Sequence, residues 1–239
     1  MSREDICWMS ATDLAKSIRR KRLSPVEVVE DILERIEVIN PKINAYVTVT
    51  ADSALAEAKR AEKAVMKGKE LGPLHGVPVS VKDLIFTKGV RTTFGCKLLE
   101  DFVPEEDAVC VARLKEAGAI LLGKTNTSEF GFKPLTDNLL FGATRNPWNL
   151  NKTPGGSSGG AGAAVASGLG HLAVGARWRG LDPHSLKLLR RLCHQASTGT
   201  YTPLPHLPWR RIHNTRGPYH KDSRGCSFDA RCYGWFSLG

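Results

Sequence analysis

Two apolar runs separated by a helical segment constrain the fold of this chain most strongly. The first, GVPVSVKDLIF from Gly76, is rich in β-branched residues and opens with Gly and Pro, which is typical of a buried strand. The second, AILLG at 119–123, directly follows a segment at 105–117 that has a helical pattern and stops at Gly118. Strands that alternate with helices in this way predict a mostly parallel sheet covered by helices, the α/β class.

Further helical segments precede the first apolar run. Ser24 is suited to cap a helix that begins at Pro25, where no N–H is needed, and Glu27 is placed to bond back to the cap. Residues 11–20 and the alanine-rich run 52–66 also have helical character. The N-terminal third is therefore predicted to be helical.

Lys82 ends the apolar run VPVSV and is followed at once by Asp83. A lysine at a desolvated strand end loses proton affinity because burial disfavours the charged form, and its amine can then act as a general base. The alternative is structural, with the side chain reaching from the strand end to a salt bridge with Asp83. Position alone favours this structural interpretation.

Ser157 and Ser158 lie in the loop PGGSSGG, which runs directly into an alanine-rich helical segment. Glycines permit unusual backbone angles, and the N–H groups at a helix start can bind an oxyanion or an anionic ligand. The alternatives are a flexible linker and a phosphate-binding loop. The uninterrupted helix argues against the linker, and the sequence lacks the pattern G-x-x-x-x-G-K-[ST] of phosphate-binding loops.

Several motifs taken together are more specific than either site alone. HGVPVSVKD, GKTNTSEF, NPWN and PGGSSGGAGAAVASG occur in an order and spacing that resemble the amidase signature family over about the first 175 residues. The resemblance implies a fold with N-terminal helices followed by a mostly parallel central sheet flanked by helices. It also implies hydrolysis of amide C–N bonds by a Ser–cis-Ser–Lys triad through an acyl-enzyme, with no metal and no cofactor.

The resemblance implies roles for individual residues. Lys82 matches the general base, and Ser157 matches the bridging serine, which follows a cis peptide bond and relays a proton. The other loop residues expected around the substrate are Gly155, Gly156, Ser158, Gly159 and Gly160. The stretch that contains Glu129 and Phe130 is expected to line the site or to pack against the sheet. The family's nucleophilic serine falls on Leu181, so the triad is predicted to be incomplete and the chain inactive.

Residues 177–239 differ in composition from residues 1–176, and we predict that the two form separate regions. Residues 177–239, which we call the C-terminal region, hold 11 of the 34 Lys and Arg residues but 3 of the 24 Asp and Glu residues, so they supply +8 of the net charge of +10. They contain no Val, Glu or Met and few apolar residues in a helical or strand period. This composition predicts a disordered region that is not homologous to the family.

A one-base shift of the reading frame accounts for the change near residue 177. If the last two bases of each codon are read with the first base of the next, Arg177 onward permits DGGGSIRIP, which is the missing family motif with serine at position 181. The same offset over 217–234 permits a run that resembles a later family segment. We therefore predict a frameshift near 174–177, in the gene or in its sequencing, and a truncated amidase domain.

Other functions of the C-terminal region follow from its composition. Its nine Arg and two Lys, with several Trp and Tyr, suit a nucleic-acid-binding arm, but the aromatic residues are not regularly spaced, and nucleic acid is not the partner we expect. A zinc site is less favoured because the spacing of its candidate ligands matches no zinc pattern. Those ligands are Cys193, His194, His213, His220, Cys226 and Cys232.

The expected partner is a small-molecule amide substrate. A general amidase and the glutaminase component of a glutamyl-tRNA(Gln) amidotransferase share the motifs above, so the resemblance leaves both open. The sequence has no apolar run of about eighteen residues, its start lacks the order of a secretory signal, and its six cysteines form no C-x-x-C pair. These features predict a cytoplasmic protein without membrane segments and with free thiols, and they leave its oligomeric state open.

Overall fold

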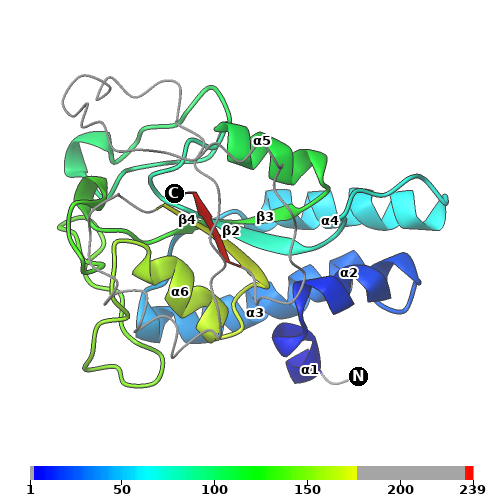
Figure 1. Ribbon diagram of the computed structural model, residues 1–239, viewed down its shortest axis with the longest axis horizontal. Coiled ribbons are helices and arrows are strands. Elements are labelled where there is room, and N and C mark those ends of the chain that lie inside the picture. Colours follow the sequence, from blue (N-terminus) through cyan, green and yellow to red (C-terminus); the bar gives the residue numbers. More distant parts are fainter. Residues whose placement is uncertain (1–2, 177–234, 239) are drawn as a thin grey trace, which may run out of the picture.

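The computed structural model describes residues 3–176 and 235–238, and its helices lie around one sheet (Figure 1). The helices are α1 (Arg3–Trp8), α2 (Ala11–Arg19), α3 (Pro25–Ile43), α4 (Ala51–Met66), α5 (Val109–Glu116) and α6 (Gly159–Ala166), with short 3-10 helices η1 (Lys97–Leu99) and η2 (Glu129–Gly131). The strands are β1 (Tyr46–Val49), β2 (Pro78–Lys82), β3 (Ile120–Thr125), β4 (Leu172–Ala176) and β5 (Trp235–Leu238).

The five strands form one sheet in the order β1-β3-β2-β4-β5. Strand β1 is antiparallel to β3, whereas every other neighbouring pair is parallel. The predicted α/β fold with a mostly parallel sheet is therefore confirmed. Because β3, β2 and β4 are parallel, their carboxyl ends lie at one edge of the sheet, where open α/β sheets bind ligands.

Strand β5 lies inside the C-terminal region, for which the composition predicts disorder. Its backbone pairs with β4, with Ala173 opposite Trp235 and Ala176 opposite Leu238. Residues 177–234 and 239 lie outside the described residues, so the predicted domain boundary at 176 and the predicted frameshift stay predictions.

The alternation of side chains along β2 gives the sheet two different faces. Val79 and Val81 belong to the main hydrophobic core, and Ser80 and Lys82 therefore point to the opposite face. On that opposite face, α6 packs against β4 through a small apolar cluster of Ala161, Val165 and Ala173. Lys82 thus ends β2 on the face that α6 covers.

The N-terminal helices form as predicted. The Ser24 hydroxyl accepts hydrogen bonds from the backbone N–H groups of Val26 and Glu27, at 3.0 and 3.4 Å, and so caps α3. The Ser24 hydroxyl also donates to the Glu62 carboxylate in α4, and this contact joins the two helices. In Figure 1, α3 runs below the strands and α5 lies above them.

The helix predicted to begin at residue 105 begins four residues later, at Val109. The preceding residues bond to the loop that follows β2 instead: the Lys88 N–H donates to the Asp107 carboxylate at 2.8 Å, and the Ala108 N–H donates to the Phe86 carbonyl at 2.9 Å. Those bonds require extended backbone at Ala108, which therefore lies outside the helix.

Candidate active site

The Lys82 side chain is fully buried and contacts both serines of the glycine-serine loop. Its Nζ donates to Ser157 Oγ at 2.7 Å and to Ser158 Oγ at 2.9 Å, and it reaches the Ala176 carbonyl at 3.3 Å. The neighbouring Asp83 carboxylate accepts hydrogen bonds from Thr93 instead. The structural alternative of a Lys82–Asp83 salt bridge is therefore wrong.

The two serines have different hydrogen-bonding capacity. Ser158 Oγ donates to the Ala176 carbonyl at 3.0 Å, so it can only accept from Lys82. Ser157 Oγ accepts from Lys82, and its own proton has no acceptor among the residues that the structure describes. Ser157 can therefore donate its proton, whereas the proton of Ser158 is already donated to the Ala176 carbonyl.

The peptide bond between Gly156 and Ser157 is cis, as the resemblance implies. The glycines around it allow the loop to lie directly against other backbone. A Cβ on Gly156 would come within 2.4 Å of the Leu135 carbonyl carbon, and a Cβ on Gly160 within 2.5 Å of the Asn126 backbone. The Thr136 hydroxyl joins the two ends of the loop, donating to the Gly155 carbonyl and accepting from the Gly159 N–H, both at 2.8 Å.

Burial changes the acidity of Lys82. Removing the amine from water disfavours its charged form and lowers the pKa of Lys82 from 10.5 to about 7. Near neutral pH a substantial fraction of such an amine is uncharged and has a free lone pair. Lys82 can therefore accept a proton from the Ser157 hydroxyl in front of it.

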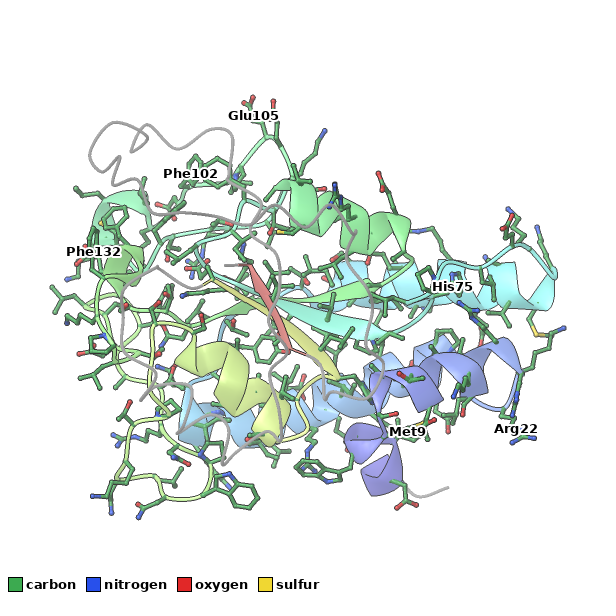
Figure 2. The ribbon with its side chains drawn as sticks, viewed as in Figure 1. Met9, Arg22, His75, Phe102, Glu105 and Phe132 are labelled. Atoms are coloured by element: carbon green, nitrogen blue, oxygen red, sulfur yellow. The ribbon has the colours of Figure 1, made fainter. Side chains whose placement is uncertain are left out.

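The 3-10 helix η2 forms a wall beside Ser157. A Cβ on Gly131 would lie 3.5 Å from Ser157 Oγ, so the glycine backbone faces this hydroxyl. Phe130 packs against Phe94, with ring centroids 5.9 Å apart, while Glu129 is exposed. Phe132, which follows η2, lies at the left edge of Figure 2, far from His75, which precedes β2.

Sequence reasoning missed a second buried lysine, Lys124, which is fully buried in β3. It donates to Ile85 O and, at 2.9 Å in both cases, to Thr87 Oγ1 and Thr92 Oγ1. The signal was present, because Lys124 follows the apolar run AILLG as Lys82 follows VPVSV. Sequence reasoning also missed Gly131, and no pattern in the sequence marks this glycine as part of the site.

The predicted nucleophile position, Leu181, lies outside the described residues, as do all six candidate zinc ligands and most of the basic C-terminal region. Within the part of the chain that is described, no group of three or more His, Cys, Asp or Glu side chains could hold a metal ion. In this same part, no helix has the length and apolar character that a membrane crossing requires.

The sequence pattern of the amidase family matches residues 27–176. The chain belongs to the amidase signature family. It is 46% identical over 171 residues to the A subunit of the glutamyl-tRNA(Gln) amidotransferase of Carboxydothermus hydrogenoformans, a match that covers 72% of this chain and 35% of that protein. It is 44% identical over 193 residues to an acylamidase of Rhodococcus erythropolis, a match that covers 81% of this chain and 40% of that protein.

Solved structures of this amidase family have the same fold. A bacterial aryl acylamidase of the amidase signature family superimposes with a TM-score of 0.68 at 38% identity, covering 70% of this chain and 35% of that one. The chain spans about a third of the length of the curated relatives it matches. By this relationship it is a member of a family of C–N hydrolases.

Proposed function

We propose that Lys82 and Ser157 are the base and the relay serine of an amide-hydrolysing site. The observation that carries the proposal is the 2.7 Å contact between a buried, weakly basic amine and a hydroxyl whose proton has no other acceptor among the described residues. A lysine placed only for structure does not need a partner with an uncommitted proton. The substrate class is a small molecule with an amide bond.

In the proposed reaction, the nucleophilic serine of the complete family site gives its proton to Ser157 Oγ, while Ser157 gives its own proton to the neutral Lys82 amine. The serine oxygen forms a bond to the amide carbon, and the C–N bond breaks. The leaving nitrogen takes up the proton held by Lys82 through the same relay. Water then hydrolyses the acyl-enzyme by the same transfers, and the reaction needs no cofactor.

The chain as written has Leu181 where the family has its nucleophile, so we propose that it does not turn over amides. A leucine side chain has no group that can attack a carbonyl carbon. Restoring the reading frame at 174–177 supplies a serine at this position, as the codon arithmetic permits. Sequencing the gene across these codons tests the frameshift directly, because a sequence in which no one-base shift yields the motif contradicts it.

An aryl amide such as 4-nitroacetanilide tests the catalytic proposal by release of nitroaniline. The chain as written should show no turnover, and the frame-restored chain should be active. In the restored chain, Lys82→Ala or Ser157→Ala should lower kcat about a thousandfold or more, whereas Lys133→Ala, a change at an exposed lysine, should not. Activity of the chain as written, if Lys82→Ala abolishes it, would contradict the predicted inactivity.

The second candidate is the A subunit of a glutamyl-tRNA(Gln) amidotransferase, which is what the relative from C. hydrogenoformans is named. The acylamidase relative supports the general amidase at nearly the same identity. Glutamine hydrolysis by the frame-restored chain, in the absence of aryl amide hydrolysis, favours the amidotransferase component. The opposite selectivity favours the general amidase, which is our main proposal.

The alternative from another class is a nucleic-acid-binding arm in the basic C-terminal region. Binding by phosphate contacts weakens steeply with salt, so retention of RNA at low but not at high ionic strength is the expected signature. A variant of the full chain with the nine Arg residues at 177–239 replaced by Gln is the control. Equal binding by this variant contradicts the arm.

A further inference from the structure

The second buried lysine lies on the face of the sheet opposite to the proposed base. Lys124 pairs with Val81 in the neighbouring strand, and Val81 belongs to the main hydrophobic core, on the other face from Lys82. Its Nζ donates to three oxygens, all in the loop that follows β2: Ile85 O, Thr87 Oγ1 and Thr92 Oγ1. Lys124 therefore ties this loop, residues 85–94, to β3.

The hydrogen-bond partners of Lys124 favour the charged form of its amine. Thr87 Oγ1 donates to the Ile85 carbonyl at 3.1 Å, and Thr92 Oγ1 donates to the Val90 carbonyl at 3.0 Å. Both hydroxyl protons are thus committed, so each hydroxyl can only accept from Lys124. Among the described residues, Lys124 Nζ has three acceptors and no donor. This arrangement suits an ammonium group, because a neutral amine has two protons and would lose one of the three bonds.

Asp83 anchors the same loop from the end of β2. Its carboxylate accepts from the Thr93 N–H at 3.2 Å and from the Thr93 hydroxyl, and its carbonyl accepts from the Phe94 N–H at 2.9 Å. Burial lowers the pKa of Lys124 from 10.5 to about 7, and the charge of Asp83 is the largest of the effects that oppose this shift. The buried ammonium and carboxylate thus hold two ends of one loop and balance each other's charge.

This loop in turn carries the wall beside Ser157. The Phe130 N–H donates to the Phe94 carbonyl at 2.8 Å, and the two phenyl rings are in contact. The next residue, Gly131, faces Ser157 Oγ. A continuous series of contacts therefore runs from Lys124 through the loop to the proposed relay serine.

We propose that Lys124 is a positioning residue that holds the loop 85–94, and through it Gly131, against the Ser157 hydroxyl. The proposal rests on the proposed function in taking Ser157 as the relay, but the fixing of the loop is independent of any activity. Lys82 and Lys124 then divide two tasks: Lys82 exchanges a proton with Ser157, and Lys124 donates hydrogen bonds to the loop and so holds Gly131 in place.

Lys124→Met tests this role, because it removes the amine with its three bonds and keeps an unbranched side chain of similar shape. Cys96 reports on the loop: it is 5% exposed, and its N–H bonds to the Thr93 carbonyl at 3.0 Å. Alkylation of Cys96 by iodoacetamide, followed by peptide mass spectrometry, should accelerate about tenfold to a hundredfold. Cys7, buried in α1, is the internal reference and should not change.

The matched control is Lys88→Met, which removes an exposed positive charge from the same loop. It should leave the Cys96 rate unchanged. A second measurement concerns the relay: the titration midpoint of Lys82, followed by ¹³Cε NMR, should rise in Lys124→Met because water reaches the amine. Lys88→Met also removes a positive charge from this loop, so a midpoint that rises in Lys124→Met alone is not an effect of charge in general.

The outcomes separate this proposal from the proposed function. An unchanged Cys96 rate in Lys124→Met, or an unmoved Lys82 midpoint, overturns the positioning role. An ordinary lysine pKa for Lys82 in the parent chain overturns the proposed function while the Cys96 result still decides the role of Lys124. If Lys124→Met fails to fold, Thr92→Val removes one acceptor alone and should accelerate Cys96 alkylation by a smaller factor, and no acceleration refutes the role.

Discussion

The ionisation of Lys82 can be measured on the chain as it is, without any catalysis. Selective ¹³Cε labelling of lysine gives one NMR signal for each of these side chains, and Lys82→Met identifies the signal of Lys82 by its loss. With burial lowering the pKa of Lys82 to about 7, this signal should titrate near neutral pH. The reference is the pKa of about 10.4 that a lysine amine has in water.

The same shift makes folding stability depend on pH with a defined sign. The difference between 10.5 in the unfolded chain and about 7 in the folded one corresponds to roughly 5 kcal/mol. Between these two values the unfolded chain binds the proton and the folded chain does not, so the free energy of unfolding rises with pH. The contribution of Lys82 is lowest below about pH 7 and increases by at most about 1.4 kcal/mol per pH unit above it.

Urea unfolding of the parent and of Lys82→Met between about pH 6.5 and 9.5 isolates this contribution. Other groups titrate in this range as well, but they are common to both chains, so the difference between the two curves belongs to Lys82. The parent should gain stability relative to Lys82→Met as the pH rises. Parallel curves, or a Lys82 signal that titrates above about pH 10, would refute the idea that this amine serves as a base near neutral pH.

Two further substitutions test how the glycine-serine loop and helix α3 are held in place. Gly160→Ala places a Cβ within 2.5 Å of the Asn126 backbone, which cannot move aside as a side chain can, and should reduce the free energy of unfolding by about 3 kcal/mol or more; a variant as stable as the parent contradicts the close approach. Ser24→Ala removes the cap of α3 and should reduce it by about 1 kcal/mol in urea unfolding. Ser53→Ala, at an exposed helical serine, is its control and should have a much smaller effect, so equal losses in the two variants contradict the capping role.

Periodicity and turn residues were sufficient to predict α2, α3, α4, β2, β3 and a mostly parallel sheet, because each local pattern agrees with the contacts that the residues make. They did not predict α1, β1, β4 or β5. The start of α5 was predicted four residues early, since the bonds of Asp107 and Ala108 to the loop after β2 are not local and leave no periodic signal.

The site divides in the same way between local and distant determinants. Lys82 and Ser157 lie in motifs with recognisable spacing, but 75 residues separate them, and only the sheet and the packing of α6 bring the amine to the hydroxyl. Gly131 has no side chain that marks it as functional. Its place beside Ser157 depends on the loop 85–94, whose Phe94 carbonyl accepts from the Phe130 N–H. A single sequence therefore does not reveal the role of residues that act through the position of their backbone.

The two buried lysines show what distinguishes a base from a structural cation. Both follow apolar runs at the ends of neighbouring strands, both are fully buried, and burial lowers the pKa of both. Their hydroxyl partners differ: among the described residues, the hydroxyls around Lys124 donate their protons to carbonyls, whereas the proton of Ser157 has no acceptor. Burial alone weakens the hold of an amine on its proton, and proton exchange also requires a partner that can both give and receive one. Among the described residues this requirement is met at Lys82 and not at Lys124, which is why we propose catalysis for the first and positioning for the second.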